Sequence, residues 1–428
     1  MREMNSTGIV WCPSIPSDWE VRRVKDCFYI SKVKAGTKNP VVLKLARSGV
    51  QVKDVTVNGG QMAESYDDYN PVQVGDLLLN PMDLYSGANC NVSEVEGVIS
   101  PAYVNLRAKE TLNPYYFDYY FKIQYWTMAM FAHGKGVSYD NRWTINAESV
   151  KAYELPFPSV SEQNAIVDII KRKSAHIDAL ISNAQQQIEK LKAYKQRVIT
   201  ETVTKGLDPD VTMKDSGYDF IGMIPASWKI CKLRHIGTPQ NGISKGGEFF
   251  GTGFPFVSYG DIYKNFTLPE TVDGLVNTTE TERKQYSVEC GDIFFTRTSE
   301  TIEEVGFSCV CEKTIPDATF AGFVIRVRPF NDKLLTGFAK YYFRSSHHRF
   351  YLVKEMNLVT RASLSQGLLK SMPVLVPPKT EQQEISDYLD HKCSQIDKLI
   401  ALKQQKIEKL QQYKKSLIYE YVTGKKEV

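Results

Sequence analysis

The sequence predicts an α+β protein with two similar α/β domains separated by two long antiparallel coiled-coil helices, pseudo-twofold within one chain. Residues 161–204 recur as residues 380–423 at a constant offset of 219, and each copy follows a block that differs in sequence. A second repeat opens each half at an offset of 209: Met4, Gly8, Ile15-Pro16 and Trp19 match Met213, Gly217, Ile224-Pro225 and Trp228. The chain is therefore a tandem duplication with units of about 4–207 and 213–428.

Composition is that of an ordinary globular protein. A length of 428 residues leaves room for two to four domains, and 42% of the residues are hydrophobic and 24% charged. No segment approaches the ~18 consecutive apolar residues of a membrane span, and the N-terminus lacks the apolar core of a signal peptide. We therefore expect a cytoplasmic protein without membrane contact. A net charge of +4 does not by itself identify a nucleic-acid binder.

The repeated segments predict two long helices. Each begins with a proline, two further residues, Ser or Thr, and Glu-Gln, as in Pro158 to Ser161-Glu162-Gln163 and Pro377 to Thr380-Glu381-Gln382. A hydroxyl at the N-cap and an acidic residue in the first turn suit a helix start, so we expect the helices to begin at Ser161 and Thr380. Apolar residues then recur every seven positions, which predicts a buried seam between the helices. The expected seam and partner-binding residues are Ile170, Ile177, Leu191 and Val198 in the first copy, and Leu389, Ile396, Leu410 and Leu417 in the second.

A helix of about 42 residues spans roughly 60 Å, which is longer than a globular core needs and suits a spacer. Lys403 interrupts the second seam where the first has Ala184, and a lysine there can extend past a small neighbour or mark the register. Pairing between two chains is the alternative. Duplication within one chain favours intramolecular pairing, because the partner is already tethered.

The two differing blocks, residues of about 18–156 and 227–375, alternate strand-like runs with turn residues. Strands are expected at Val72 to Leu79, Ile293 to Phe295 and Phe323 to Val327, and helices at Tyr115 to Phe131 and Leu334 to Phe350. Gly75-Asp76 and Gly291-Asp292 each open an apolar strand. The expected domains are 1–156 and 227–375, with spacer helices at 157–206 and 376–428 and a linker at 207–226.

One loop in each block carries matching cations. At the offset of 219, Lys135 falls on Lys354 and Arg142 on Arg361, although the residues around them differ. Cations kept in variable polar loops suit contacts to phosphates, and polar neighbours can read base edges. The candidate DNA-binding residues are His133, Lys135, Ser138, Tyr139, Asn141, Arg142, Lys354, Asn357, Thr360 and Arg361. Pairing of Arg142 with Glu148 and of Arg361 with Glu355 are the structural alternatives.

No catalytic or metal-binding motif is found. The eight cysteines lack zinc-ligand spacing and are expected to be reduced and buried or inert. Asn80-Pro81-Met82-Asp83 lacks the second proline and the aromatic residue of a motif that holds a flipped adenine, so we interpret it as a turn. Gly134-Lys135 lacks the other residues of a phosphate-binding loop, and His347-His348 cannot share one helix face.

The chain resembles the specificity subunits of type I restriction-modification systems. The resemblance rests on Met213-Lys214-Asp215-Ser216-Gly217 with Ile224-Pro225-Ala226-Ser227-Trp228, on the fainter Ile15-Pro16-Ser17-Asp18-Trp19, and on the twin Glu-Gln helices ending in Val203-Thr204 and Val422-Thr423. It implies two target-recognition domains that read a split sequence of double-stranded DNA. It also implies two modification subunits bound to the helices, and restriction subunits. S-adenosylmethionine, ATP and Mg are expected only in those partner subunits.

We therefore expect a non-catalytic DNA-recognition subunit that binds a bipartite asymmetric site, since the two blocks differ, and directs methylation and cleavage by its partners. The spacer helices would set the gap between the half-sites. A coiled-coil scaffold with two peptide- or protein-binding domains is the alternative. A self-contained enzyme is disfavoured by the missing motifs.

Overall fold

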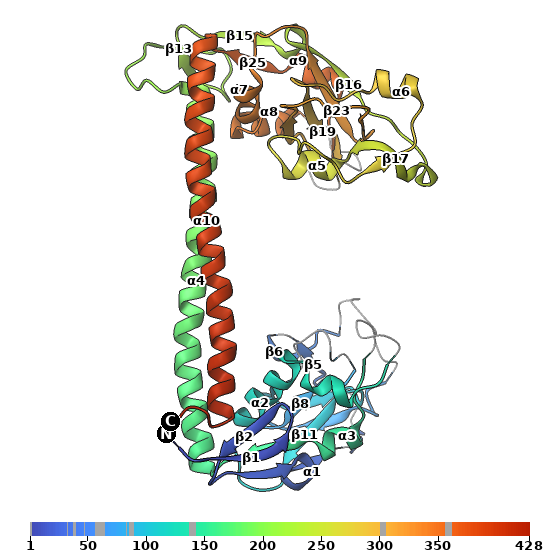
Figure 1. The fold of residues 1–428 in the computed structure, drawn as a ribbon, viewed down its shortest axis with the longest axis vertical. Coiled ribbons are helices and arrows are strands. Elements are labelled where there is room, and N and C mark those ends of the chain that lie inside the picture. The colour runs from blue at the N-terminus through green and yellow to red at the C-terminus, as the bar shows by residue number, and fades with distance from the viewer. Residues whose placement is uncertain are drawn as a thin grey trace. The chain divides into compact units, whose positions relative to one another are not determined.

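The computed structural model describes residues 2–31, 33–36, 40–46, 48–55, 65–82, 84, 90–136, 143–299, 305–355 and 362–428 (Figure 1). The chain forms two compact units: unit 1 is residues 1–184 with 405–428, and unit 2 is residues 185–404. The chain has two long helices, α4 (Val160–Lys205) and α10 (Lys379–Val422). Each of them belongs partly to unit 1 and partly to unit 2. The predicted α+β class with long paired helices is confirmed.

In unit 1, four antiparallel strands form the main sheet in the order β4-β11-β8-β9. Their bounds are β4 Phe28–Ile30, β8 Leu77–Leu79, β9 Cys90–Val92 and β11 Val104–Ala108. Helix α2 (Pro114–Trp126) contributes Tyr116, Phe117, Tyr120 and Phe121 to the core beneath this sheet. The other elements are β1 Met4–Ile9, β2 Cys12–Pro16, β3 Glu20–Arg23, α1 Val24–Cys27, β5 Leu43–Ala46, β6 Gly49–Val52, β7 Asn70–Val72, β10 Gly97–Ile99, η1 Ala129–His133, α3 Ala147–Ala152 and β12 Glu154–Phe157.

In unit 2, the sheet has the order β16-β23-β19-β21, which repeats the chain order of the sheet in unit 1. Its strands are β16 Gly237–Asn241, β19 Ile293–Thr296, β21 Ser308–Val310 and β23 Val324–Pro329, and α7 (Thr336–Tyr342) packs on it as α2 does in unit 1. The other elements are β13 Met213–Asp215, β14 Met223–Pro225, β15 Lys229–Lys232, η2 Leu233–His235, η3 Gly247–Phe249, β17 Phe250–Val257, α5 Tyr259–Lys264, β18 Leu275–Val276, α6 Glu280–Gln285, β20 Thr298–Ser299, β22 Thr319–Phe320, α8 Ser346–Glu355, β24 Ala362–Ser363, α9 Gln366–Ser371 and β25 Pro373–Val376.

The same buried ion pair holds both sheets. Asp76 precedes β8 and bonds Arg107 on β11 at 2.7 Å, and Asp292 precedes β19 and bonds Arg328 on β23 at 2.6 Å. Both carboxylates are buried, and each also accepts a backbone N–H from three residues earlier in the chain. A buried charge needs such partners, because leaving it unpaired costs several kcal/mol. The Gly-Asp repeat seen in the sequence is therefore a structural feature of the domain frame.

Several predicted elements differ from those observed. The run Val72 to Leu79 is two strands, because Gly75 has a φ of 93° and turns the chain between β7 and β8. The first short helix ends at Trp126, where Met128 adopts a left-handed φ of 59°, and the second is split into α7 and α8. Both long helices begin before the predicted residue: Ser159 Oγ accepts the N–H of Glu162 at 3.3 Å, and α10 starts at Lys379.

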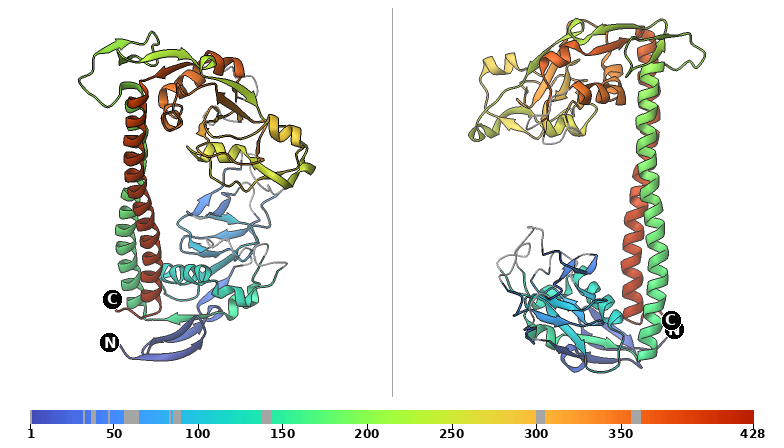
Figure 2. Two further views of the ribbon diagram at one scale, coloured as in Figure 1. Left: turned by 45° about the horizontal axis from the view of Figure 1, so that its top comes forward. Right: turned by 180° about the vertical axis from the view of Figure 1, so that it is seen from behind.

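The predicted seam between α4 and α10 is confirmed within each unit, where the two helices lie side by side (Figure 2). Ile170, Ile177, Val198, Leu389, Ile396 and Leu417 are buried, and Leu191 and Leu410 are half-buried. Lys195 bonds Asp397 at 2.6 Å in unit 2, and the residues at the offset of 219, Lys414 and Asp178, bond at 2.7 Å in unit 1. Lys403 donates to the side-chain oxygen of Gln187. The pairing is thus antiparallel and within one chain, and Lys403 extends to a polar partner beside the seam.

The described helices include none that is long and apolar enough to cross a membrane. All eight cysteines are free; six are buried, Cys231 is half-buried, and Cys290 is exposed. Within the described ranges, His, Cys, Asp and Glu side chains form no group of three that could hold a metal ion.

Candidate nucleic-acid interface

Each unit attaches its domain to the start of a long helix through the same tryptophan. Trp19 Nε1 donates to Glu162 on α4 at 2.9 Å, and Trp228 Nε1 donates to Glu381 on α10 at 2.9 Å. The end of the other helix packs here too. A Cβ at Gly424, after α10, would overlap Pro16, and a Cβ at Gly206, after α4, would overlap the Glu381 carboxylate. The repeated sequence motifs therefore form a joint between a domain and both helix ends.

In each unit, the glutamine that follows this glutamate binds main-chain groups of the domain. The Gln163 side-chain oxygen accepts the backbone N–H of Asn113 at 2.8 Å, and that of Gln382 accepts the backbone N–H of Leu335 at 2.8 Å. Both glutamines are fully buried, and their amide groups donate to the carbonyls of Pro158 and Pro377. Because these partners are backbone groups, the glutamine contacts do not depend on the side chains of the differing domains.

The predicted DNA-binding loops lie mostly outside the described residues. This applies to Ser138, Tyr139, Asn141 and Arg142 in unit 1, and to Asn357, Thr360, Arg361 and the side chain of Lys354 in unit 2. Their role stays a prediction. Lys135 is exposed, and its backbone pairs with Thr144 at 2.7 and 2.9 Å. The ring of His133 lies edge-on to Trp11 at 5.1 Å and to Tyr153 at 5.4 Å, so it also has a packing role.

The backbone around these loops shows that a second loop accompanies each of them. In unit 1, the chain after β8 bonds the far end of the predicted loop: the N–H of Leu84 donates to Trp143 O at 3.1 Å, and the N–H of Ile145 donates to Pro81 O at 2.9 Å. In unit 2, β20 after β19 pairs with β24, and the N–H of Leu364 donates to Arg297 O at 2.7 Å. In each unit, the described residues that border two loops are therefore hydrogen-bonded to each other. The sequence predicted only one of these loops.

Helix α8 leads into the predicted loop of unit 2 and is held by a buried histidine. His348 Nδ1 lies 2.9 Å from Ser345 Oγ, and its ring packs edge-on against Tyr342 at 4.2 Å. Burial, together with the neighbouring His347, lowers the pKa of His348 to about 3. The folded unit therefore excludes a proton that the unfolded chain accepts.

This burial predicts acid sensitivity. Above pH 6.5, His348 is neutral in both the folded and the unfolded chain. Between pH 6.5 and about pH 3, only the unfolded chain binds the proton. The free energy of unfolding should therefore fall by about 1.4 kcal/mol for each pH unit below 6.5. Urea unfolding measures the free energy of unfolding at pH 7 and at pH 5. The difference between the two values should be about 2 kcal/mol smaller in His348→Gln than in the native chain. His391→Gln, at an exposed position, should keep the native difference; equal pH slopes in both variants would contradict the assignment.

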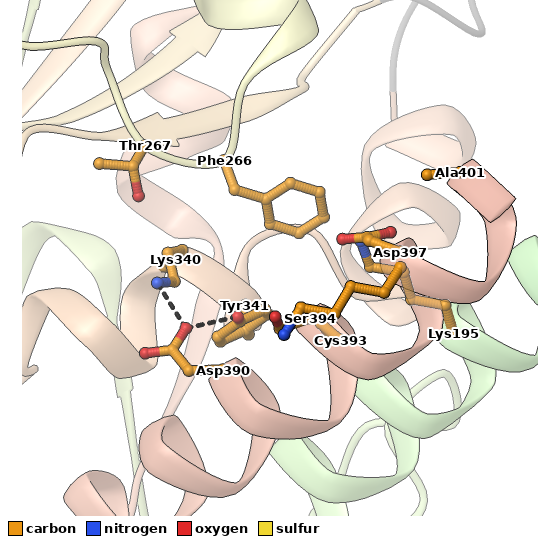
Figure 3. Close-up of a pocket in the computed structure, with 11 residues that line it drawn as sticks. Lys195, Phe266, Thr267, Lys340, Tyr341, Asp390, Cys393, Ser394, Asp397 and Ala401 are labelled. Carbon is orange, nitrogen blue, oxygen red and sulfur yellow. Dashed lines mark hydrogen bonds and ion pairs between the residues drawn. The ribbon is translucent and has the colours of Figure 1, made fainter. Parts of the chain in front are cut away.

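A cleft of about 550 Å³ lies between α10 and the domain of unit 2 (Figure 3). Lys340 Nζ and the Tyr341 hydroxyl both bond Asp390, each at 2.6 Å, and Lys195 bonds Asp397 nearby. These charges are paired within the cleft, and burial raises the pKa of Tyr341 above its ordinary value. The arrangement holds the domain against the helix.

Comparison with known proteins finds a family match over part of the chain. Residues 225–412 match the family described as type I restriction modification DNA specificity domain. The chain carries a type I DNA specificity domain. The resemblance drawn from the sequence is thus confirmed, and the match covers the domain of unit 2 together with the start of α10 and most of its length.

One relative extends the likeness over nearly the whole chain, and another over about half of it. The chain is 23% identical to the type I restriction enzyme MjaVIII specificity subunit of Methanocaldococcus jannaschii, over 96% of this chain and 93% of that protein. It is 24% identical to the EcoKI specificity subunit of Escherichia coli, over 56% of this chain and 51% of that protein.

Solved structures show the same fold. A chain from a study of complex assembly and conformational transition of the type I R-M system matches with a TM-score of 0.72 and 16% identity, over 96% of this chain and 99% of that chain. The HsdS subunit of Thermoanaerobacter tengcongensis matches with a TM-score of 0.52 and 16% identity, over 96% of this chain and 98% of that chain. The specificity domain of unit 2 and its counterpart in unit 1 therefore belong to a fold already seen in specificity subunits.

Proposed function

We propose that this chain is the sequence-specific DNA-recognition subunit of a type I restriction-modification complex. Each unit reads one half of a bipartite site, and the half-sites differ because the loops of the two units differ. The observation that carries this proposal is the repeated frame: the same joint and the same sheet carry unlike loops at one edge. Residues on loops held by a rigid scaffold are where binding specificity is usually found.

The chemistry belongs to partner subunits in this proposal. Two modification subunits supply S-adenosylmethionine-dependent methylation, and restriction subunits use ATP and Mg for cleavage, while this chain is non-catalytic and acts in the cytoplasm. The family match supports this division, and so does the likeness to a chain from a type I R-M assembly. That α4 and α10 set the gap between the half-sites remains a prediction.

The test is binding and methylation by the complex of this chain with its modification subunits. Methylome sequencing of the host should yield one bipartite asymmetric motif, and a duplex carrying it should bind more tightly than a scrambled duplex. Raising the salt concentration from 50 to 200 mM should weaken binding by about 10³-fold or more if six or more phosphates are contacted. Salt-independent binding, or methylation without a motif, would contradict the proposal and favour a protein-binding scaffold.

A further inference from the structure

An aromatic side chain projects from a fixed turn at the loop edge of the sheet in unit 2. Phe323 lies between β22 and β23, and its side chain is 62% exposed. Three backbone hydrogen bonds hold the chain around it: Ala321 N donates to Val257 O at 3.0 Å, Val324 N to Ala321 O at 3.0 Å, and Arg297 N to Phe323 O at 2.9 Å. The turn is therefore rigid although the ring is open to solvent.

Two glycines allow this turn to pack against the end of β16. A Cβ at Gly242 would overlap the carbonyl oxygens of Phe320 and Ala321, and a Cβ at Gly322 would overlap Ser244 Oγ. The N–H of Ile243 donates to Phe320 O at 2.9 Å across this contact. Such close packing of backbone against backbone fixes the position from which the Phe323 ring projects. It orders few side chains and therefore costs little side-chain conformational entropy.

The turn lies beside the two loops already described in unit 2. Arg297 links them: its N–H donates to Phe323 O, its carbonyl accepts from Leu364 N at 2.7 Å, and its guanidinium donates to Gly322 O at 3.3 Å. Leu364 follows the predicted DNA-binding loop. Phe323 is thus joined through Arg297 to the described residues that border both loops. An exposed aromatic residue elsewhere on the surface would not have this position.

The corresponding position in unit 1 has no aromatic ring. Leu79 pairs with Val104 in one sheet as Phe295 pairs with Ile325 in the other, and the ion pairs of Asp76 and Asp292 agree with this alignment. Val104 therefore corresponds to Ile325, and the residue two positions earlier is Ala102 in unit 1 and Phe323 in unit 2. The ring is therefore a difference between the two reading edges.

We propose that Phe323 contacts the bases of the half-site read by unit 2 and helps to determine that half-site. This inference rests on the proposed function. Phenylalanine recognises DNA through apolar contact with base edges, such as a thymine methyl group, or by entering a base step, while nearby cations contact phosphates. A ring held by a rigid turn makes such a contact without first losing conformational freedom.

The experiment uses the full chain assembled with its modification subunits, with a duplex carrying the methylated motif and a scrambled duplex. Phe323→Ala is compared with Phe330→Ala, because Phe330 follows the other end of β23 and its side chain is 63% exposed. Phe323→Ala should weaken binding to the motif by about ten- to a hundredfold and leave binding to the scrambled duplex unchanged. Phe330→Ala should match the native complex on both duplexes.

Base substitutions assign the contact further. Phe323→Ala should relax discrimination at one or more positions of the half-site read by unit 2, and keep full discrimination at every position of the other. If Phe323→Ala and Phe330→Ala bind the motif equally, the role of Phe323 is refuted while the proposed function stands. If the native complex does not distinguish the motif from the scrambled duplex, the proposed function itself fails, and this inference fails with it. Matching melting temperatures of both variants and the native chain confirm that folding is intact.

Discussion

Replacement of residues 20–157 by the corresponding block of another specificity subunit is expected to change one half of the methylated motif and to leave the other half unchanged. The expected effect is large, because each mismatched base pair costs about 1–3 kcal/mol and a half-site contains several. The original half-site should therefore lose all specific methylation. Methylome sequencing of cells that express the chimera with its modification subunits measures this directly.

The joint between the domain and the helices explains why a chimera with an exchanged block should fold. The boundaries keep Trp19 and Glu162 in the native chain, and β3 and β12, which pair over Glu20 to Phe157, move together. The side-chain oxygen of Gln163 binds the new block through the backbone N–H of residue 113, a group that every residue except proline supplies. The main-chain part of the attachment therefore tolerates changes in the sequence of the domain.

The reciprocal exchange is the matched control. Residues 229–376 are bounded by the equivalent strands β15 and β25, and their replacement should change the other half of the motif only. A chimera of either kind that alters both halves would show that the two units do not read DNA independently. A chimera that folds and methylates the native motif would show that recognition lies outside these blocks.

The repeated parts of the molecule were predictable from the sequence, because duplication shows which residues are shared. The seam at Ile177 and Ile396 follows from heptad spacing, and the structure adds the ion pairs of Lys195 and Lys414 in equivalent places. Local rules failed at helix starts, since Ser161 has the residue type of an N-cap while Ser159 makes the contact. Glu162 was predicted to favour the helix dipole, yet its carboxylate also bonds Trp19 from 143 residues away.

The candidate interface was only partly predictable. Matching cations pointed to one loop in each unit, but the second loop is brought beside it by sheet pairing between segments far apart in sequence, as Leu84 with Trp143 shows. The sequence pattern predicts Phe323 as the first residue of a strand, because such a pattern cannot distinguish an exposed residue just before a strand from a buried residue within it. The turn that exposes it depends on close packing of Gly242 and Gly322, which is a tertiary property.

Gln382→Leu is expected to destabilise unit 2 by about 3–5 kcal/mol, because the side chain is buried and no leucine can replace its hydrogen bonds. The substitution leaves the N–H of Leu335 without its acceptor and the carbonyls of Lys333 and Pro377 without their donor. Each buried group without a partner costs about 1–3 kcal/mol, and the gain in apolar side chain offsets only part of this. Amide hydrogen exchange of the full chain should show faster exchange at Leu335 and through α7.

Gln383→Leu is the control, since Gln383 is the next residue on α10, is exposed, and bonds only locally to Asp387 at 2.9 Å among the described contacts. It makes the same chemical change at the same helix end and should alter unfolding by less than about 0.5 kcal/mol. Exchange in α2 of unit 1 should be unchanged in both variants, because Gln163 performs the equivalent task there. Equal exchange at Leu335 in the two variants would mean that the buried glutamine does not hold the domain to the helix. The bond between Trp228 and Glu381 would then be the main polar contact of the joint, and Trp228→Phe, which removes the indole N–H, should produce the loss expected here for Gln382→Leu.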